Sequence, residues 1–375
     1  MEITNSNQGR LISLDFFRGL TIAGMILVNN PGSWKYIYAP FKHTEWHGWT
    51  YTDTIFPFFL FIVGVSITFA LSKRLNAGSS KSLVLKKIIL RTLIIFAIGL
   101  FLNVFPFFNL INARIMGVLQ RIALCYFFAS IIFIYTSKRG QIIWTAGLLL
   151  IYWLFMALFP VPDVGSGSYL KNENFAAYFD RFILSTNHMW NQSKTWDPEG
   201  IFSTIPAIAT TLFGVLTGQI LKSKINPTTK LKKLLGWGVS AITVGYFWSI
   251  WLPINKSLWT SSYAILMAGL AMIVLVICFY IIDIKGFKKF PQPFVIFGMN
   301  AITMFVFSIL IAKFLHIIKV NGSNGIISLQ SLICQNVFQP IFGNYFGSLM
   351  FAFTFILVLY LFALILYKNR IIIKI

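Results

Sequence analysis

Long apolar runs recur along this chain, and each is close to the length that crosses a bilayer, roughly 20 residues. Only 11% of the residues are charged, whereas a soluble domain carries about 25%. Such a chain cannot cover a water-facing surface, so we predict an all-α, polytopic membrane helix bundle of about ten transmembrane helices, forming a single domain over residues 1–375. The predicted spans are 12–30, 53–72, 86–105, 116–136, 141–160, 201–221, 232–251, 259–282, 293–316 and 346–367.

The distribution of charge predicts how the bundle is oriented. A net charge of +21 would suggest nucleic acid in a soluble protein, but here the cations fall in alternate loops. They cluster at 73–87, 138–139, 222–233, 285–289 and in the C-terminal tail, while the intervening loops hold most of the acids. Because cytoplasmic loops are rich in Lys and Arg, both termini are expected inside the cell. The expected surroundings are a lipid bilayer, with no nucleic acid partner.

One outer loop carries the strongest cluster of titratable groups. The segment FKHTEWHGWTYTDTIFPFF places His43, Glu45, His47 and Asp53 at an aromatic-rich mouth. A histidine titrates near neutral pH and can take a proton from an attacking amine or hydroxyl. A catalytic cluster and a merely solvated loop both remain open. No metal is predicted, because these residues match no common ligand spacing.

Ionisable groups also occur inside the apolar runs, where they are costly and tend to be functional. Asp15 and Arg18 are three apart in SLDFFRGL and share a helix face. They form either a purely structural ion pair or a site at which Arg18 meets a phosphate. Gln120 and Arg121 lie within RIMGVLQRIALCYF. They either join a buried network with Asp15 or Asp53, or line a reaction chamber.

Polar groups mark two further outer segments. Asp197 and Glu199 flank a proline in WDPEGIFSTIPAI. They either cap the following helix or bind a polar or cationic acceptor. Lys256 lies at another outer mouth, in PINKSLWTSSY. The residues by themselves leave both an enzyme and a transporter of sugars or amines open.

Several of these segments, in order, resemble the heparan-alpha-glucosaminide N-acetyltransferase family and its bacterial YeiB-like transmembrane acyltransferase relatives. The matching segments run from about residue 10 to 310 and are SLDFFRG, LVN, KHTEWHGWTYTDTIFPFFLFIVGVSI, RIMGVLQR, WDPEGIFSTIPAI, GVLTG, INKSLWTSSY and GMNAI. The resemblance implies transfer of an acetyl group from cytoplasmic acetyl-CoA to the amino group of glucosamine or a short amino sugar on the far side. A membrane O-acyltransferase of a polysaccharide and a transporter are the alternatives.

The resemblance also implies roles for individual residues in a bacterial cytoplasmic (inner) membrane. His43 matches the active histidine, and Asn29 matches a nearby asparagine that would stabilise an oxyanion. Either Asp53 or Glu45 would orient the imidazole. A homodimer is kept as a candidate assembly. The expected contacts to coenzyme A are Arg18, Arg121 and Gln120, and those to the amino sugar are Trp46, Asp197, Glu199 and Lys256.

Overall fold

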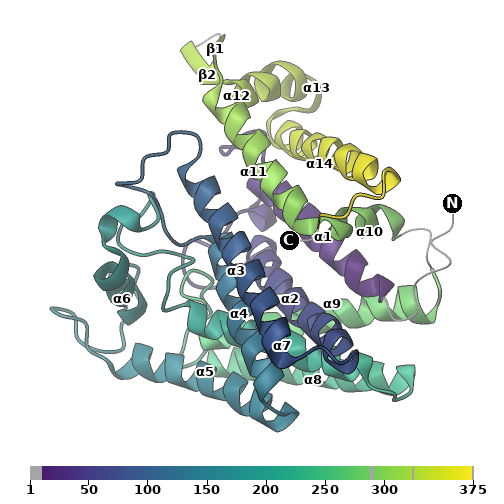
Figure 1. Ribbon diagram of the computed structural model, residues 1–375. Helices are drawn as coiled ribbons and strands as arrows, with labels where there is room; N and C mark the ends of the chain where they lie inside the picture. The colour runs from purple at the N-terminus through teal and green to yellow at the C-terminus, as the bar shows by residue number, and fades with distance from the viewer. Residues whose placement is uncertain (1–10, 288–290, 323–324, 374–375) are drawn as a thin grey trace. The chain divides into compact units, whose positions relative to one another are not determined.

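The structure is a computed structural model that describes residues 11–287, 291–322 and 325–373 (Figure 1). Their regular secondary structure is almost entirely helical, and the sheet among them is a two-stranded hairpin. The chain divides into two compact units. Unit 1 comprises the chain up to Ile37 and from Ile273 onward, and unit 2 comprises Tyr38–Met272. Helix α9 (Ser261–Cys278) passes from unit 2 into unit 1.

Unit 2 contains long helices joined by loops that carry most of the predicted site. Its elements before α9 are η1 (Ala39–Phe41), α2 (Tyr51–Asn76), α3 (Lys81–Val104), α4 (Val118–Tyr135), α5 (Lys138–Leu158), α6 (Phe175–Leu184), η2 (Thr186–His188), α7 (Thr204–Lys222) and α8 (Pro227–Trp248). Polar side chains begin several of them. Ser80 and Asn226 accept backbone N–H groups at the starts of α3 and α8, as is usual for N-cap residues.

Unit 1 is built around α1 (Ile12–Asn29), which packs against α10, α11 and α14. Its hairpin pairs β1 and β2 in antiparallel register from Lys319 opposite Ser328 to Gly322 opposite Gly325. The other elements of unit 1 are η3 (Phe279–Ile284), α10 (Gln292–Met299), α11 (Ala301–Ile317), β1 (Lys319–Gly322), β2 (Gly325–Ser328), α12 (Leu329–Ile333), η4 (Cys334–Phe338), α13 (Gln339–Phe342) and α14 (Asn344–Lys368).

The apolar runs predicted from the sequence all lie in helices, which confirms the polytopic helical membrane fold. Among the described residues, seven helices are long and apolar enough to cross a membrane: α1, α2, α4, α5, α7, α9 with η3, and α14. The pair α10 and α11, bent by 82°, would form an eighth span. The lysine-bearing helices α3 and α8 are not among the seven. Lys288 and Lys289 of the predicted inner cations lie outside the described residues.

Helix α7 is the core of unit 2 and packs against α2, α4, α5 and α8. Its closest neighbour is α2, and two glycines allow this approach. A Cβ atom at Gly64 would lie 1.9 Å from the Thr211 carbonyl oxygen, and one at Gly214 would lie 2.0 Å from the Phe61 carbonyl oxygen. Small residues of this kind let membrane helices pack backbone to backbone. The spacing between α2 and α7 therefore requires glycine at both positions.

The outer helices of unit 2 leave apolar side chains uncovered. Leu93 of α3, Ile143 of α5 and Val239 of α8 are each more than half exposed. In a soluble protein such surface would be an aggregation hazard, but it matches the hydrocarbon that surrounds a membrane span. These faces are consistent with α3, α5 and α8 lining the outside of the bundle.

Candidate functional site

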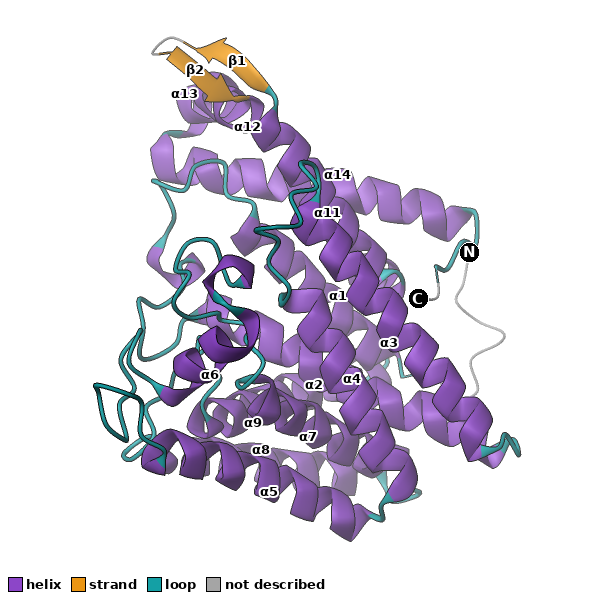
Figure 2. Ribbon diagram, turned by 60° about the vertical axis from the view of Figure 1, so that its left-hand side comes forward, coloured by secondary structure: helices purple, strands orange, loops and turns teal. Residues whose placement is uncertain are grey.

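The loops at one end of unit 2 are tied together by backbone and side-chain hydrogen bonds. The Gly48 N–H donates to the Ile254 carbonyl at 2.7 Å, and the Trp46 Nε1–H donates to the Tyr169 carbonyl at 2.8 Å. The turn before α2 is thus bound both to the turn before α9 and to the long segment between α5 and α7. Figure 2 shows these teal loops gathered beside α6.

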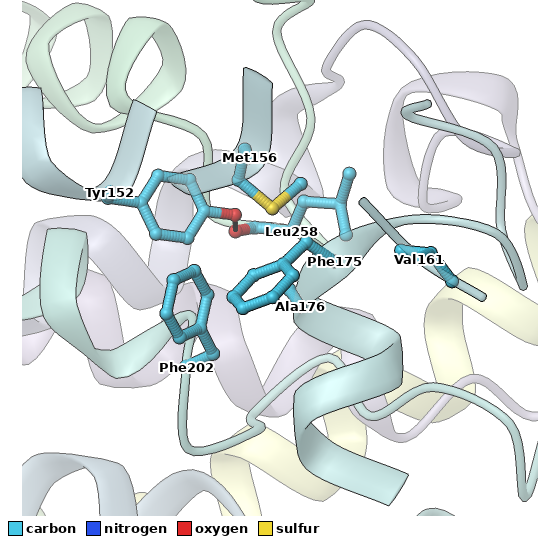
Figure 3. Packing of buried hydrophobic residues seen from close by; sticks show 7 residues of the cluster. All are labelled: Tyr152, Met156, Val161, Phe175, Ala176, Phe202 and Leu258. Carbon is cyan, nitrogen blue, oxygen red and sulfur yellow. Dashed lines mark hydrogen bonds between the residues drawn. The ribbon is translucent and has the colours of Figure 1, made fainter. Parts of the chain in front are cut away.

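A buried cluster with several aromatic side chains packs against these loops. Tyr152 of α5 donates its hydroxyl to the Leu258 carbonyl at 2.6 Å, while Phe175 and Phe202 pack beside it (Figure 3). The Phe175 and Phe202 rings meet edge to face with centroids 5.1 Å apart. The segment after α5, the start of α7 and the turn before α9 therefore share one buried apolar base.

His43 and Asp53 form a dyad at this end of unit 2. The His43 Nδ1 atom lies 2.6 Å from Oδ1 of Asp53. The carboxylate is fully buried, whereas 53% of the histidine side chain is exposed. Of the two acids expected to orient the imidazole, Asp53 is therefore the one in contact with it, and its role in catalysis stays a prediction. Glu45, the other acid proposed to orient the imidazole, is exposed in the same loop.

The position of Asp53 follows from its place in the first turn of α2. Its Oδ2 accepts the N–H of Thr50 at 2.9 Å and the N–H of Thr44 at 3.1 Å, so it caps the helix and fixes the preceding loop. Both oxygens are then acceptors, and Oδ1 must accept the proton on Nδ1 of His43. The Nε2 atom of a neutral His43 is left without a proton, which is the form that a general base requires.

Trp46, which lies between His43 and Asp53 in the dyad loop, belongs to an aromatic group. Its ring is 5.0 Å from that of Trp196, which in turn is 5.0 Å from that of Trp190. The Lys171 ammonium lies 5.7 Å from the Trp46 ring centre. All three tryptophans are only partly buried, so they offer apolar ring faces beside polar groups.

Four charged side chains from three loops, those before α4, α7 and α9, form a charge-balanced cluster. Arg114 donates through Nε to Asp197 Oδ2 at 2.9 Å and through Nη2 to Glu199 Oε2 at 2.6 Å. A second bond joins Arg114 Nη2 to Asp197, and the Lys256 ammonium lies 3.5 Å from Glu199. Burial would raise the pKa of the Glu199 carboxyl, but the charges of Lys256 and Arg114 lower it to about 2. Two cations and two anions leave no net charge to attract a cationic acceptor.

Arg121 is fully buried and holds the segment that follows this cluster. Its guanidinium donates to the carbonyls of Pro198 and Gly200 at 3.0 and 2.9 Å and to the Ser203 hydroxyl. It also lies over the Trp259 ring, 5.1 Å from the centre. These partners differ from Asp15 and Asp53, the acids that the sequence suggested for a buried network.

Gln120 of α4 is buried against the preceding helix, α3. A Cβ atom at Gly99 of α3 would lie 2.5 Å from its Oε1, so the close contact depends on glycine. Its Nε2 has no hydrogen-bond partner among the described residues. The predicted contact of Gln120 and Arg121 with coenzyme A stays a prediction.

Asp180 is a buried acid that sequence reasoning did not assign to the site. Its Oδ1 accepts the Phe202 N–H at 3.1 Å, and a Cβ atom at Gly200 would lie 1.7 Å from Oδ2. Burial raises the pKa of Asp180 to about 7. The signal in the sequence was a single acid within the apolar stretch FAAYFDRFIL of α6.

The remaining predicted residues belong to unit 1. Arg18 donates to Asp15 at 3.0 Å within α1, so the expected ion pair is present. Asn29 is the exposed last residue of α1, while the buried Asn30 side chain donates back to the Ile26 carbonyl at 2.9 Å. The pairing of Asn29 with His43 stays a prediction, because the two residues belong to different units.

The described residues contain no group of three or more His, Cys, Asp or Glu side chains arranged to hold a metal.

The chain is similar in sequence to curated proteins. The chain is 31% identical to heparan-alpha-glucosaminide N-acetyltransferase of Mus musculus over 362 residues, which cover 81% of this chain and 54% of the mouse protein. The Homo sapiens protein of the same name is 31% identical over 351 residues, or 79% of this chain and 52% of the human protein.

The chain spans about half the length of these curated relatives. A family model described as heparan-alpha-glucosaminide N-acetyltransferase, catalytic, matches residues 10–245. The matched region includes the His43–Asp53 dyad, Arg114 with its partners Asp197 and Glu199, and Arg121, whereas Lys256 lies beyond it. This chain therefore belongs to the heparan-alpha-glucosaminide N-acetyltransferase catalytic family.

Proposed function

We propose that this protein is a transmembrane N-acetyltransferase. It moves an acetyl group from cytoplasmic acetyl-CoA to the amino group of glucosamine or a short amino sugar on the extracytoplasmic side of a bacterial inner membrane. Both termini lie in the cytoplasm, as the alternation of cationic and acidic loops indicates. The reaction forms a carbon–nitrogen bond and breaks the thioester carbon–sulfur bond.

The observation that carries the proposal is the 2.6 Å contact between His43 and a buried Asp53, in a chain of an N-acetyltransferase family. A carboxylate that holds Nδ1–H of a partly exposed imidazole leaves Nε2 directed away from the pair. That arrangement orients a base towards an incoming nucleophile. A transporter has no comparable need for it.

Transfer proceeds by direct attack in a ternary complex. The amine nitrogen attacks the thioester carbonyl while His43 Nε2 takes its proton. The tetrahedral intermediate then collapses and expels the CoA thiolate, which takes up the proton from His43. The family resemblance implies that Asn29 would stabilise the oxyanion of this intermediate. Asp53 stabilises the imidazolium that forms in between. General-base help of this kind typically contributes roughly 100- to 10,000-fold to the rate.

On the donor side, Arg18, at the cytoplasmic end of α1 by the charge rule, would contact the CoA phosphates. Guanidinium groups suit phosphate because they bind it through two parallel N–H bonds. Gln120 and Arg121 are proposed near the acyl donor, with Arg121 also holding the 198–203 segment in place. CoA binding that survives Arg18→Glu would remove this arginine from the donor site.

On the acceptor side, the sugar ring would pack on the partly buried Trp46. The charges of Asp197, Glu199 and Lys256 are already balanced with Arg114. We therefore assign this cluster to the sugar hydroxyls and not to an ammonium group. This fits attack by a neutral amine.

The test is acetyl transfer from radiolabelled acetyl-CoA by the purified full-length protein to a panel of amino sugars. His43→Ala should lose most turnover but keep folding and CoA binding. His316→Ala, which removes an exposed imidazole from α11, is the matched control and should stay active. Trapping of an acetyl-imidazole at His43 with acetyl-CoA alone would replace direct attack by a covalent route.

The acceptor panel separates the alternatives. Transfer to hydroxyl groups and not to amines would make the protein a membrane O-acyltransferase. Absence of transfer to every acceptor, together with saturable uptake of a sugar or amine into vesicles, would make it a transporter.

A further inference from the structure

The loop that carries the dyad holds a second imidazole, His47, in a defined position. Its Nδ1 lies 3.4 Å from the side-chain nitrogen of Asn255, and its ring meets that of Trp46 at a steep angle with centroids 6.2 Å apart. The next residue, Gly48, is bound through its N–H to the Ile254 carbonyl. The two turns therefore hold His47 from both the side chain and the backbone.

The orientation of the Asn255 amide is fixed by its surroundings. This residue is fully buried, and its Oδ1 accepts the Leu258 N–H at 2.9 Å. Its backbone N–H donates to the Thr260 hydroxyl, and its carbonyl accepts the Thr260 N–H, each at 3.1 Å. Because the amide oxygen is engaged by an N–H, the atom that faces His47 is the NH₂ group, which can only donate.

A donor facing Nδ1 selects one tautomer of His47. Nδ1 must act as the acceptor, so the neutral ring carries its proton on Nε2. Burial lowers the pKa of His47 below its ordinary value of 6.5, which favours the neutral ring. The dyad histidine has the opposite arrangement, since Asp53 holds the proton of His43 on Nδ1. One loop thus presents an imidazole whose Nε2 accepts a proton and another whose Nε2–H donates a hydrogen bond.

We propose that the Nε2–H of His47 donates a hydrogen bond to a hydroxyl oxygen next to the amino group of the acceptor sugar. This inference rests on the proposed function and adds a residue that determines specificity. The indole ring of Trp46, which contacts the His47 ring, supplies an apolar face for the sugar ring. His47 supplies a hydrogen-bond donor at the edge of that sugar. An Nε2 that already carries a proton cannot take another from the amine, so His47 does not replace His43 as the base.

The kinetic test compares glucosamine with its 1-deoxy and 3-deoxy analogues, each of which lacks one hydroxyl beside the amine. His47→Ala should raise KM for glucosamine by roughly three- to tenfold, the usual value of one neutral hydrogen bond, with little change in kcat. One deoxy analogue should show no further loss in the variant. His47→Gln, which keeps an N–H donor, should recover part of the KM effect.

The spectroscopic test uses the four histidines of the chain, labelled with ¹⁵N in the full-length protein. At neutral pH, His47 should show a protonated Nε2 and His43 a protonated Nδ1. Asn255→Asp places an acceptor opposite Nδ1, so it should move the His47 proton to Nδ1 and reproduce the KM effect of His47→Ala.

Three results would overturn the proposal. One is a His47 protonated at Nδ1 in the wild type. Another is a KM for glucosamine that His47→Ala leaves unchanged, or a further rise in KM that the variant shows equally with both deoxy analogues. The third is a kcat loss as large as that of His43→Ala, which would make His47 part of the proton transfer. Absence of acetyl transfer by the wild type would instead contradict the proposed function, and the tautomer measurement would still decide the state of His47.

Discussion

The substitution Asp53→Asn tests the dyad more sharply than removal of the histidine, because the fold dictates how the new amide must lie. Oδ2 of Asp53 accepts two backbone N–H groups, from Thr44 and Thr50. An asparagine can keep these bonds only with its oxygen at that position. Its NH₂ group then faces Nδ1 of His43 and can only donate. The histidine must move its proton to Nε2, where the base is needed.

The expected loss follows from this change of tautomer. With Nε2 protonated, general-base assistance disappears, and kcat should fall by roughly 100- to 10,000-fold. Stability should change little, because the oxygen that caps α2 is retained. The lost negative charge near the first turn of the helix costs about 0.3–1 kcal/mol. Binding of CoA should stay as in the wild type.

The assay is steady-state acetyl transfer together with thermal unfolding of the same samples. The double variant His43→Ala, Asp53→Asn should be no slower than His43→Ala alone, since residues that act as a unit are not additive. Glu45→Gln, an exposed acid in the same loop, is the matched control. Near-normal kcat in Asp53→Asn, or a large loss in Glu45→Gln, would contradict the assignment of Asp53.

Three further predictions concern stability and orientation. Because burial raises the pKa of Asp180 to about 7 from 3.8, the folded protein holds a proton that the unfolded chain releases. The free energy of unfolding should therefore fall as pH rises from 4 to 7, and Asp180→Asn should flatten that slope in thermal melts; an unchanged slope would exclude this group. Arg114→Met leaves two buried carboxylates without their guanidinium and should cost about 3–5 kcal/mol in denaturant titration, whereas exposed Arg139→Met should cost almost nothing. A cysteine replacing Lys171 should react with an impermeant thiol reagent in intact cells and one replacing Lys81 should not, against a background of buried native cysteines; the reverse pattern would invert the orientation.

Much of the fold could be predicted because its main signal is local. Apolar runs of bilayer length and alternating loop charge mark helices and their order without any knowledge of packing. The run at 293–316 shows the limit, since it is broken into α10 and α11 with an 82° bend. Composition records how apolar a segment is, but not whether its backbone stays straight.

The sequence could suggest contacts only between candidate site residues that are close along the chain. His43 and Asp53 are ten residues apart, and Asp53 was one of two acids, with Glu45, expected to orient the imidazole. The alternative of a buried network between Arg121 and Asp15 or Asp53 could not foresee its actual partners, because an arginine can be satisfied by backbone carbonyls such as those of Pro198 and Gly200. Carbonyls are present at every position, so no sequence pattern marks them. The tautomer of His47 likewise depends on Asn255, which only the folded chain brings beside it.

The glycine contacts between α2 and α7 give the reacting end a remote dependence. Gly64 lies eleven residues after Asp53, or roughly 16 Å along the helix at 1.5 Å per residue. Gly214, the second glycine of this contact, lies on α7, and α7 follows the segment that Arg121 and Arg114 bind. The contact at Gly64 and Gly214 fixes how closely α2 and α7 approach each other. It therefore also sets the distance between the ends of the two helices, although it does not contact the substrate. One methyl group added at Gly64 or Gly214 would increase the distance between the His43–Asp53 dyad and the Arg114 cluster. The rate of acetyl transfer should then change, although the substitution lies deep in the bundle.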